Sequence, residues 1–218
     1  MLSIFAPHFF NWTEQFRNSG HEVYWLDVFD SNTRVKQIGF VDQIIGWRYK
    51  RNYPGRYFIK KDLPKLNKFI NKFNERDLAT VFEKKLQEIR PDVVLSFVMY
   101  LATAPILEVM KNHPEIKWIY SSWGSDLYYY RNQPEHLKDM NMVFPNLDFM
   151  FSDCNRDVLL ASEHGFKGKF LGVFPGRGGF DFRRSDALLK PFEKRTTLLI
   201  KGYQGKHGRS IPVLEAIL

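Results

Sequence analysis

The stretch Lys117-Trp-Ile-Tyr-Ser-Ser-Trp-Gly-Ser-Asp-Leu127 is a short aromatic and β-branched run that ends in a Trp-Gly-Ser-Asp turn. In an open α/β sheet, ligands bind outside the carboxyl ends of the strands, so small and acidic residues at such a turn are candidates for ligand contact. Gly124 would let the backbone approach a ligand, and Asp126 would accept hydrogen bonds from hydroxyl groups. The alternative is a plain turn with a helix cap, since Ser and Asp favour both places.

Strand and helix patterns alternate on both sides of this stretch, with Gly or Pro at many of the turns. We expect further strands over Leu2–Ala6, His21–Val28, Gln37–Val41, Asp92–Val98, Asp148–Ser152 and Lys169–Phe174. We expect helices over Trp12–Asn18, Leu66–Ile89, Ala102–Lys111, Pro134–Met140 and Asn155–His164, with Pro7–Asn11 as a loop. This order predicts an α/β fold, a Rossmann-like doubly wound parallel sheet flanked by helices.

The pattern changes after the last of these strands. Pro175–Asp181 is rich in glycine, and a new strand over Thr196–Lys201 and a helix from Ile211 follow a charged stretch. A strand, a loop and an opening helix cannot bury a core of their own, so we expect the natural protein to continue past Leu218. The sequence thus predicts a first domain over residues 1–182, a linker over 183–195 and the truncated start of a second domain over 196–218.

Composition excludes several classes of protein. A hydrophobic content of 44% with 26% charged residues is ordinary for a globular protein, and Cys154 alone forms no internal disulfide. No apolar run spans a bilayer and no signal segment opens the chain, so we expect a cytoplasmic protein. No dinucleotide fingerprint, Walker loop or metal-spaced histidine pair occurs, and we predict neither a metal nor a cofactor.

The chain is basic, with a net charge of +8, and many of its cations lie between residues 48 and 72 among tyrosines and phenylalanines. Such a patch suits an anionic lipid surface or a diphosphate-bearing acceptor. The predicted peripheral contact with the inner face of the membrane uses Arg48, Lys50, Arg51, Lys60 and Lys61, and no nucleic acid is expected. The alternative is a solvated loop and helix face.

Two further groups of residues are candidates for a site. His8 follows the first strand, at the edge where ligands bind, or it packs there. Lys201, Lys206 and Arg209 surround a glycine loop before the last helix, where backbone amides favour anions. The segment Ser152–Asn155 is expected to cap the helix that follows it.

Several short motifs occur in a characteristic order: Pro91-Asp92-Val93-Val94, the Trp-Gly-Ser-Asp turn, Phe151-Ser152, Pro175–Asp181 and Leu199-Ile200-Lys201-Gly202-Tyr203. In this order they resemble the retaining glycosyltransferases of the GT-B fold, family-4 type. In that family an N-terminal acceptor domain precedes a domain that binds a nucleotide sugar. Trp123 stands where the family often has a histidine, and no catalytic residue is carried over.

The resemblance implies a hexosyltransferase that moves a sugar from a nucleotide-sugar donor to a saccharide or lipid-linked acceptor, in polysaccharide or glycolipid synthesis. His8, Trp123, Gly124 and Asp126 would form the acceptor wall. Lys201, Lys206 and Arg209 would begin the donor diphosphate site, and the 218-residue chain would be inactive alone. Two other functions stay open: a non-catalytic module that binds anionic surfaces or nucleic acid, and a sugar-nucleotide epimerase of similar fold.

Overall fold

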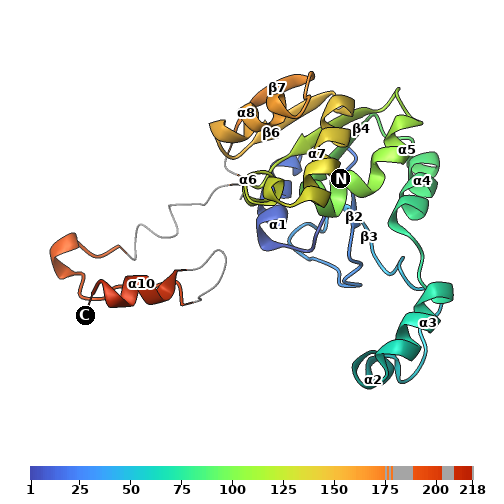
Figure 1. Cartoon of the computed structure of the whole chain (residues 1–218), viewed down its shortest axis with the longest axis horizontal. Coiled ribbons are helices and arrows are strands. Elements are labelled where there is room, and N and C mark those ends of the chain that lie inside the picture. Colours follow the sequence, from blue (N-terminus) through green and yellow to red (C-terminus); the bar gives the residue numbers. More distant parts are fainter. Residues whose placement is uncertain (175, 177, 179–188, 203–208, 218) are drawn as a thin grey trace. The chain divides into compact units, whose positions relative to one another are not determined.

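A computed structural model describes residues 1–174, 176, 178, 189–202 and 209–217 of the chain. Within these residues, seven parallel strands form one sheet in the order β3-β2-β1-β4-β5-β6-β7 (Figure 1). The strands are β1 (Leu2–Ser3), β2 (Tyr24–Asp27), β3 (Asp42–Ile44), β4 (Val93–Phe97), β5 (Lys117–Ser121), β6 (Phe149–Ser152) and β7 (Lys169–Val173). The prediction of a Rossmann-like α/β fold with a parallel sheet is therefore confirmed.

Helices cover both faces of the sheet, as parallel strands require. The described helices are α1 (Pro7–Thr13), α2 (Arg56–Asp62), α3 (Pro64–Asn74), α4 (Leu78–Ile89), α5 (Leu107–Lys111), α6 (Ser125–Tyr128), α7 (Pro134–Val143), α8 (Asn155–Glu163) and α10 (Ser210–Glu215). Adjacent residues of β4 show the two buried faces, because Val94 and Leu95 pack into different apolar clusters. This double burial explains why the strand reads as a continuous apolar run.

Two predicted boundaries near the N-terminus are wrong. Residues 7–11 are not a loop, because α1 already begins at Pro7, which suits the first helical position since its missing N–H needs no partner there. The third strand is β3 and not Gln37–Val41, which forms turns closed by Val41 N–H donating to the Ile38 carbonyl. Ile38 and Val41 are buried, so their apolar character resembled that of a strand.

The long amphipathic region predicted over Leu66–Ile89 is two helices, α3 and α4. The break lies at residues 75–77, where Asp77 caps α4 by accepting a hydrogen bond from Thr80 N–H at 3.1 Å. The region predicted as a helix over Ala102–Lys111 begins instead with a π-helical segment, Met99–Thr103, and a 3-10 turn before α5. The helix predicted over Trp12–Asn18 begins five residues earlier, at Pro7, and a 3-10 turn, Glu14–Phe16, follows it. The other strands and helices predicted before residue 175 agree with the structure to within a few residues at each end.

The chain divides into two units, Met1–Gly179 and Phe180–Leu218. In the second unit the described elements are a 3-10 turn, Phe192–Lys194, and α10. The strand predicted over Thr196–Lys201 is wrong: Leu199 is 94% exposed, and this segment has no strand partner among the residues described. A strand needs a neighbouring backbone for its ladder, and an apolar β-branched pattern does not provide one.

No helix within the described ranges combines the length and the apolar content that crossing a bilayer requires.

Candidate functional site

The candidate site lies at the carboxyl edge of the sheet, where the strand order reverses between β1 and β4. This switch point is where open α/β sheets bind ligands. The chain leaves β1 into the first turn of α1, which holds His8, and leaves β5 into the turn formed by Trp123 and Gly124. The segment after β6 begins with Asp153.

Gly124 forms a γ-turn at the end of β5. Its φ and ψ are 70° and −66°, and Ser125 N–H donates to the Trp123 carbonyl at 2.8 Å. Residues that carry a side chain rarely adopt these backbone angles. A Cβ at Gly124 would also lie 3.2 Å from both carboxylate oxygens of Asp153. The turn therefore needs glycine, both for its backbone angles and for the close approach of Asp153.

Asp126 ties this turn to the end of β4. Its Oδ1 accepts the Trp123 N–H at 2.9 Å, and its Oδ2 accepts the Met99 N–H at 2.9 Å and the Tyr120 hydroxyl at 2.6 Å. The side chain is only 3% exposed. Asp126 thus braces the turn from inside, and its contact with a ligand hydroxyl stays a prediction.

Burial dominates the electrostatics of this brace. It raises the pKa of Asp126 to about 6, even though three hydrogen bonds favour the carboxylate. Burial, and then the charge of Asp126, raise the pKa of the Tyr120 hydroxyl well above its usual value. The Tyr120 hydroxyl is therefore a hydrogen-bond donor to a buried carboxylate, and the pair fixes the geometry of the edge.

Backbone strain marks the end of β4, beside the brace. Val98 has a φ of 66° and a ψ of 105°, in a region that a β-branched residue rarely occupies. Its neighbour Met99 donates its N–H to Asp126, and the Val98 carbonyl accepts the Ala102 N–H at 3.1 Å. Such strain persists only where the surroundings impose it, and it gathers at functional sites.

The structure brings two of the predicted acceptor residues, His8 and Trp123, into contact. Their rings meet edge to face with centroids 4.2 Å apart, and both side chains are partly exposed. The Trp123 ring also lies 5.8 Å from that of Phe97, and a Cβ at Gly176 would be 3.5 Å from Trp123 Cδ1. Trp123 Nε1 is buried and finds no acceptor among the residues described. A buried N–H without an acceptor is a natural contact for a ligand oxygen or a water.

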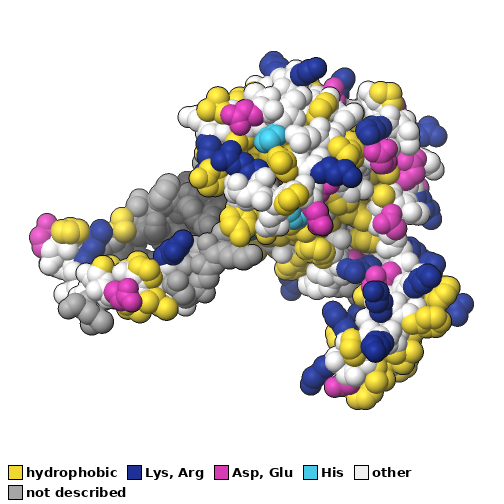
Figure 2. All heavy atoms as spheres, viewed as in Figure 1, with side chains coloured by type: hydrophobic (Ala, Val, Ile, Leu, Met, Phe, Trp, Pro, Cys, Tyr) yellow, Lys and Arg dark blue, Asp and Glu magenta, His cyan; other side chains and the backbone are white. Residues whose placement is uncertain are grey.

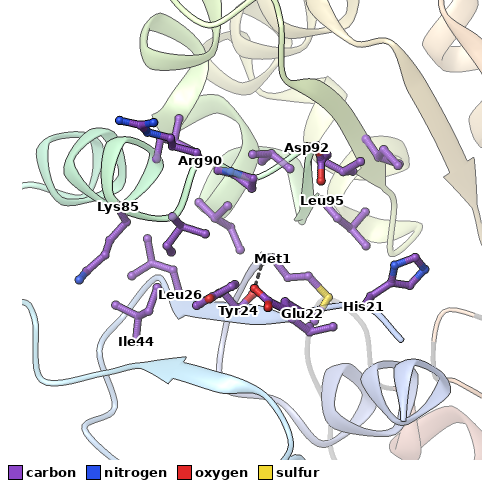
Figure 3. Close-up of a pocket in the computed structure, with 18 of the residues that line it drawn as sticks. Met1, His21, Glu22, Tyr24, Leu26, Ile44, Lys85, Arg90, Asp92 and Leu95 are labelled. Carbon is purple, nitrogen blue, oxygen red and sulfur yellow. Dashed lines mark hydrogen bonds between the residues drawn. The ribbon is translucent and has the colours of Figure 1, made fainter. Parts of the chain in front are cut away.

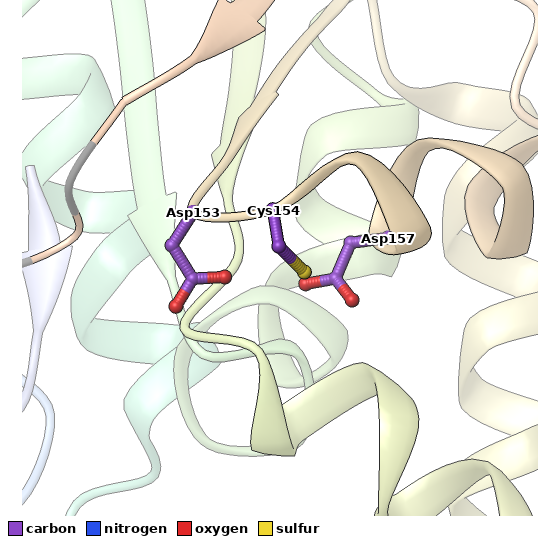
Figure 4. Close-up of side chains that lie close together, drawn as sticks. All are labelled: Asp153, Cys154 and Asp157. Carbon is purple, nitrogen blue, oxygen red and sulfur yellow. The ribbon is translucent and has the colours of Figure 1, made fainter.

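Asp153, Cys154 and Asp157 form a cluster (Figure 4). The first two belong to the segment predicted only as a helix cap. One ligand atom of each lies within 4.8 Å of the others. Asp157 is fully buried and accepts hydrogen bonds from Ser122 Oγ at 2.9 Å and Arg156 Nη2 at 3.0 Å. Burial, and then the charge of Asp157, raise the pKa of Asp153.

The predicted cap is not made by a side chain, since Cys154 occupies the N-cap of α8 without a capping hydrogen bond from its thiol. The exposed carboxylate of Asp153 beside Gly124 is the group that the sequence analysis missed. The sequence did contain a signal for Asp153. A Ser-Asp pair lies at the end of this strand, just as the pair Ser125-Asp126 lies after another strand. Three such groups could coordinate a cation, but the guanidinium of Arg156 already offsets the charge of Asp157.

The predicted diphosphate residues belong to the second unit. Lys201 and Arg209 are exposed, and Arg209 immediately precedes α10. Lys206 lies outside the described residues. The role of these three cations stays a prediction.

A cavity of about 650 Å³ lies at the opposite edge of the sheet, at the amino ends of β1, β2 and β4 (Figure 3). Its walls are mostly apolar, with Lys85, Arg90 and Asp92 at the sides. The Met1 α-amino group donates to the Tyr24 carbonyl at 2.6 Å, and burial lowers its pKa to about 5. Its position at the amino edge and its apolar lining make this cavity a weaker candidate than the switch point.

The carboxyl edge therefore offers an indole N–H, an imidazole and an exposed carboxylate on a braced, partly strained frame. These groups suit a hydroxyl-rich ligand, which both donates and accepts hydrogen bonds and presents apolar faces to aromatic rings. No family model matches the chain, and no curated protein matches it either.

Proposed function

We propose that the chain is the acceptor-binding half of a retaining glycosyltransferase of the GT-B type. The sugar would come from a nucleotide sugar held by the second domain. The observation that carries the proposal is the placement of Trp123 at the switch point, against His8, with its buried Nε1 lacking an acceptor among the described residues. An indole ring offers an apolar face to a sugar ring, and its N–H is a donor for a sugar oxygen.

In this proposal the acceptor lies along the carboxyl edge, with Trp123 against an apolar sugar face and Asp153 accepting from a hydroxyl. Asp126 holds the Trp123 backbone in place. Closure of the second domain would exclude water and align the acceptor hydroxyl with the anomeric carbon. Lys201, Lys206 and Arg209 would offset charge on the departing diphosphate, with no metal. The chain by itself is expected to bind the acceptor without transferring sugar.

Saturation-transfer NMR of the whole chain with a panel of mono- and oligosaccharides tests the proposal. At least one saccharide is expected to bind, and Trp123→Ala should weaken its binding about tenfold, the loss of roughly 1.4 kcal/mol of contact energy. Tyr57→Ala, which removes an exposed aromatic ring from α2, is the matched control and should bind like the parent. Absence of saccharide binding, or binding that Trp123→Ala leaves unchanged, contradicts the proposal.

A sugar-nucleotide epimerase fits the same edge less well. An enzyme of this kind that uses a nicotinamide cofactor needs amides and glycine after β1, and here α1 opens with Pro7 and buries Phe9 and Phe10. The two activities separate in one assay: an epimerase converts a free nucleotide sugar with no acceptor present, whereas a transferase needs one. Conversion of a nucleotide sugar by the chain alone would replace the proposed function.

A further inference from the structure

Helices α2 and α3 form a hairpin whose base is tied to the rest of the first unit. Lys50 N–H donates to the Asn74 carbonyl at 2.8 Å, and Asn74 exchanges two side-chain hydrogen bonds with the Arg51 backbone. Arg76 Nη1 donates to the Trp47 carbonyl at 2.9 Å. The buried Trp47 in turn donates from Nε1 to the Asp27 carbonyl at the end of β2. These hydrogen bonds therefore connect the base of the hairpin to the end of β2.

Beyond this base, the hairpin keeps its apolar side chains outside. Neither helix contains a buried residue. The large apolar side chains that remain exposed are Tyr57 (79%), Phe58 (62%), Leu63 (44%), Leu66 (44%), Phe69 (64%) and Phe73 (62%). Figure 2 shows apolar and basic side chains side by side over this hairpin. An apolar patch of this kind on an exposed element marks an interaction surface.

The cations of α3 flank its apolar face. Leu66, Phe69 and Phe73 follow the i, i+3, i+7 spacing that places them on one side of the helix. Lys65, Lys68 and Lys72 repeat the same spacing one residue earlier, on the adjoining side. Over residues 56–74 the sequence has six Lys or Arg and one acidic residue, Asp62.

We propose that the α2–α3 hairpin docks on an anionic lipid bilayer. An apolar helix face bordered by lysines lies in the plane of a membrane interface, with its rings in the headgroup and acyl boundary and its ammonium groups at lipid phosphates. Each lysine near an anionic surface strengthens binding roughly fivefold. This proposal does not depend on the glycosyltransferase assignment, since it uses residues outside the carboxyl edge.

Charge and composition favour lipid over the other occupants. A second copy of the chain would bring two strongly basic hairpins together, and like charges at an interface oppose association. The phosphates of a nucleic acid would contact the lysines, but they offer no apolar surface to the exposed side chains of Leu63 and Leu66. A bilayer contacts both kinds of side chain, the apolar ones at the headgroup and acyl boundary and the lysines at the lipid phosphates.

The structure also changes which cations carry the contact. Of the five predicted from the sequence, Arg48 pairs with Glu75 at 3.3 Å, and Lys50 Nζ donates to the Phe73 carbonyl at 2.8 Å. These two stabilise the base of the hairpin, where the backbone of the exposed Arg51 also pairs with the Asn74 side chain. Lys60 and Lys61 are exposed on α2 and stay in the proposed surface, and Lys65, Lys68 and Lys72 join them.

Vesicle co-sedimentation of the full chain tests the proposal. The chain should sediment with vesicles of equal parts phosphatidylcholine and phosphatidylglycerol, and not with phosphatidylcholine alone. The triple variant Lys65→Gln, Lys68→Gln, Lys72→Gln should bind the anionic vesicles on the order of 100-fold more weakly. The double variant Phe69→Ser, Phe73→Ser should also lose binding, because it removes the inserted rings.

The matched control is Lys138→Gln, Lys167→Gln, Lys169→Gln, which removes the same charge from exposed positions outside the hairpin. This control should bind the anionic vesicles within about twofold of the parent. Equal loss in both lysine triples would show attraction by net charge alone and overturn the proposal. A chain that does not bind anionic vesicles would also overturn the proposal. In that case, dimerisation that depends on Phe69 and Phe73 would point to a second copy as the occupant. Binding to a random oligonucleotide that depends on the lysines but not on the phenylalanines would point to nucleic acid.

Discussion

The carboxyl edge of the sheet and the α2–α3 hairpin distribute polar and apolar groups in opposite ways. At the edge, the charged Asp126 is buried and its oxygens accept hydrogen bonds from three protein donors. On the hairpin, Phe69 and Phe73 are more than half exposed. Substitution of the buried Asp126 should therefore change the stability of the fold, whereas substitutions on the hairpin should change binding and leave the fold intact.

Asp126→Ala should have the largest effect on stability. It leaves Met99 N–H, Trp123 N–H and the Tyr120 hydroxyl buried without an acceptor, and we expect a loss of about 3 to 5 kcal/mol in the free energy of unfolding. Urea denaturation measures the loss. Asp153→Ala is the control, because that carboxylate is exposed and should change the stability by less than about 0.5 kcal/mol. Similar losses in both variants would contradict the structural role assigned to the hydrogen bonds of Asp126.

The pH dependence of stability should report the same carboxylate. The pKa of Asp126 rises from 3.8 to about 6 on burial, so the folded state binds the proton more tightly than the unfolded chain does. This contribution to stability is fully present below about pH 4 and is lost as the pH rises through about 6.

Asp126→Asn cannot titrate and provides the reference for this measurement. Between about pH 4 and pH 7, the unfolding free energy of the parent should fall relative to that of the variant by about 3 kcal/mol. Urea denaturation at each pH gives both values. A difference that stays constant with pH would mean that Asp126 titrates alike in the folded and unfolded chain.

Gly124→Ala should cost about 2 kcal/mol of unfolding free energy, from the γ-turn backbone and the contact with Asp153. Gly55→Ala is the matched control, since Gly55 has a φ of 77° and its Cβ would meet nothing within 4 Å. We expect about 1 kcal/mol there. Adding Asp153→Ala to Gly124→Ala should recover part of the loss; a complete recovery would assign the whole cost to the side-chain contact.

The smallest change in stability is expected from Phe69→Ser with Phe73→Ser on the hairpin. Both rings are exposed, so the free energy of unfolding should change by less than about 0.5 kcal/mol for each. Thermal and urea unfolding of the double variant provide the measurement. A loss of several kcal/mol would mean that these rings stabilise the fold and would end the contrast between the two regions.

Local patterns in the sequence predict the parallel sheet well, because its central strands are apolar on both faces. Val94 and Leu95 face opposite clusters, and their run reads as a strand without any knowledge of partners. The same reasoning misplaced β3, because the buried Ile38 and Val41, which precede that strand, lie in turns. A buried turn and a buried strand have the same hydropathy, and only backbone hydrogen bonding separates them.

The candidate site is predictable in place but not in detail. The Trp-Gly-Ser-Asp turn marks the carboxyl edge, since its residue types follow a strand. The role of Asp126 depends on Met99, which is distant in sequence and meets it only in the folded chain. The contacts between His8 and Trp123, and between Gly124 and Asp153, likewise join separate strand ends. No single-sequence pattern contains those pairs.

Strand β1 has a consequence for how the molecule opens. It is two residues long, lies between β2 and β4 and pairs with β4 at one register position, Leu2 with Ser96. By contrast, β4 and β5 pair along five positions. The pairing of β1 with β4 is therefore a short seam in the sheet, and amide hydrogen exchange should be slower in β4–β6 than in β2 and β3. The carboxyl-edge site lies across that seam, so the least protected part of the sheet adjoins the place where a ligand would bind.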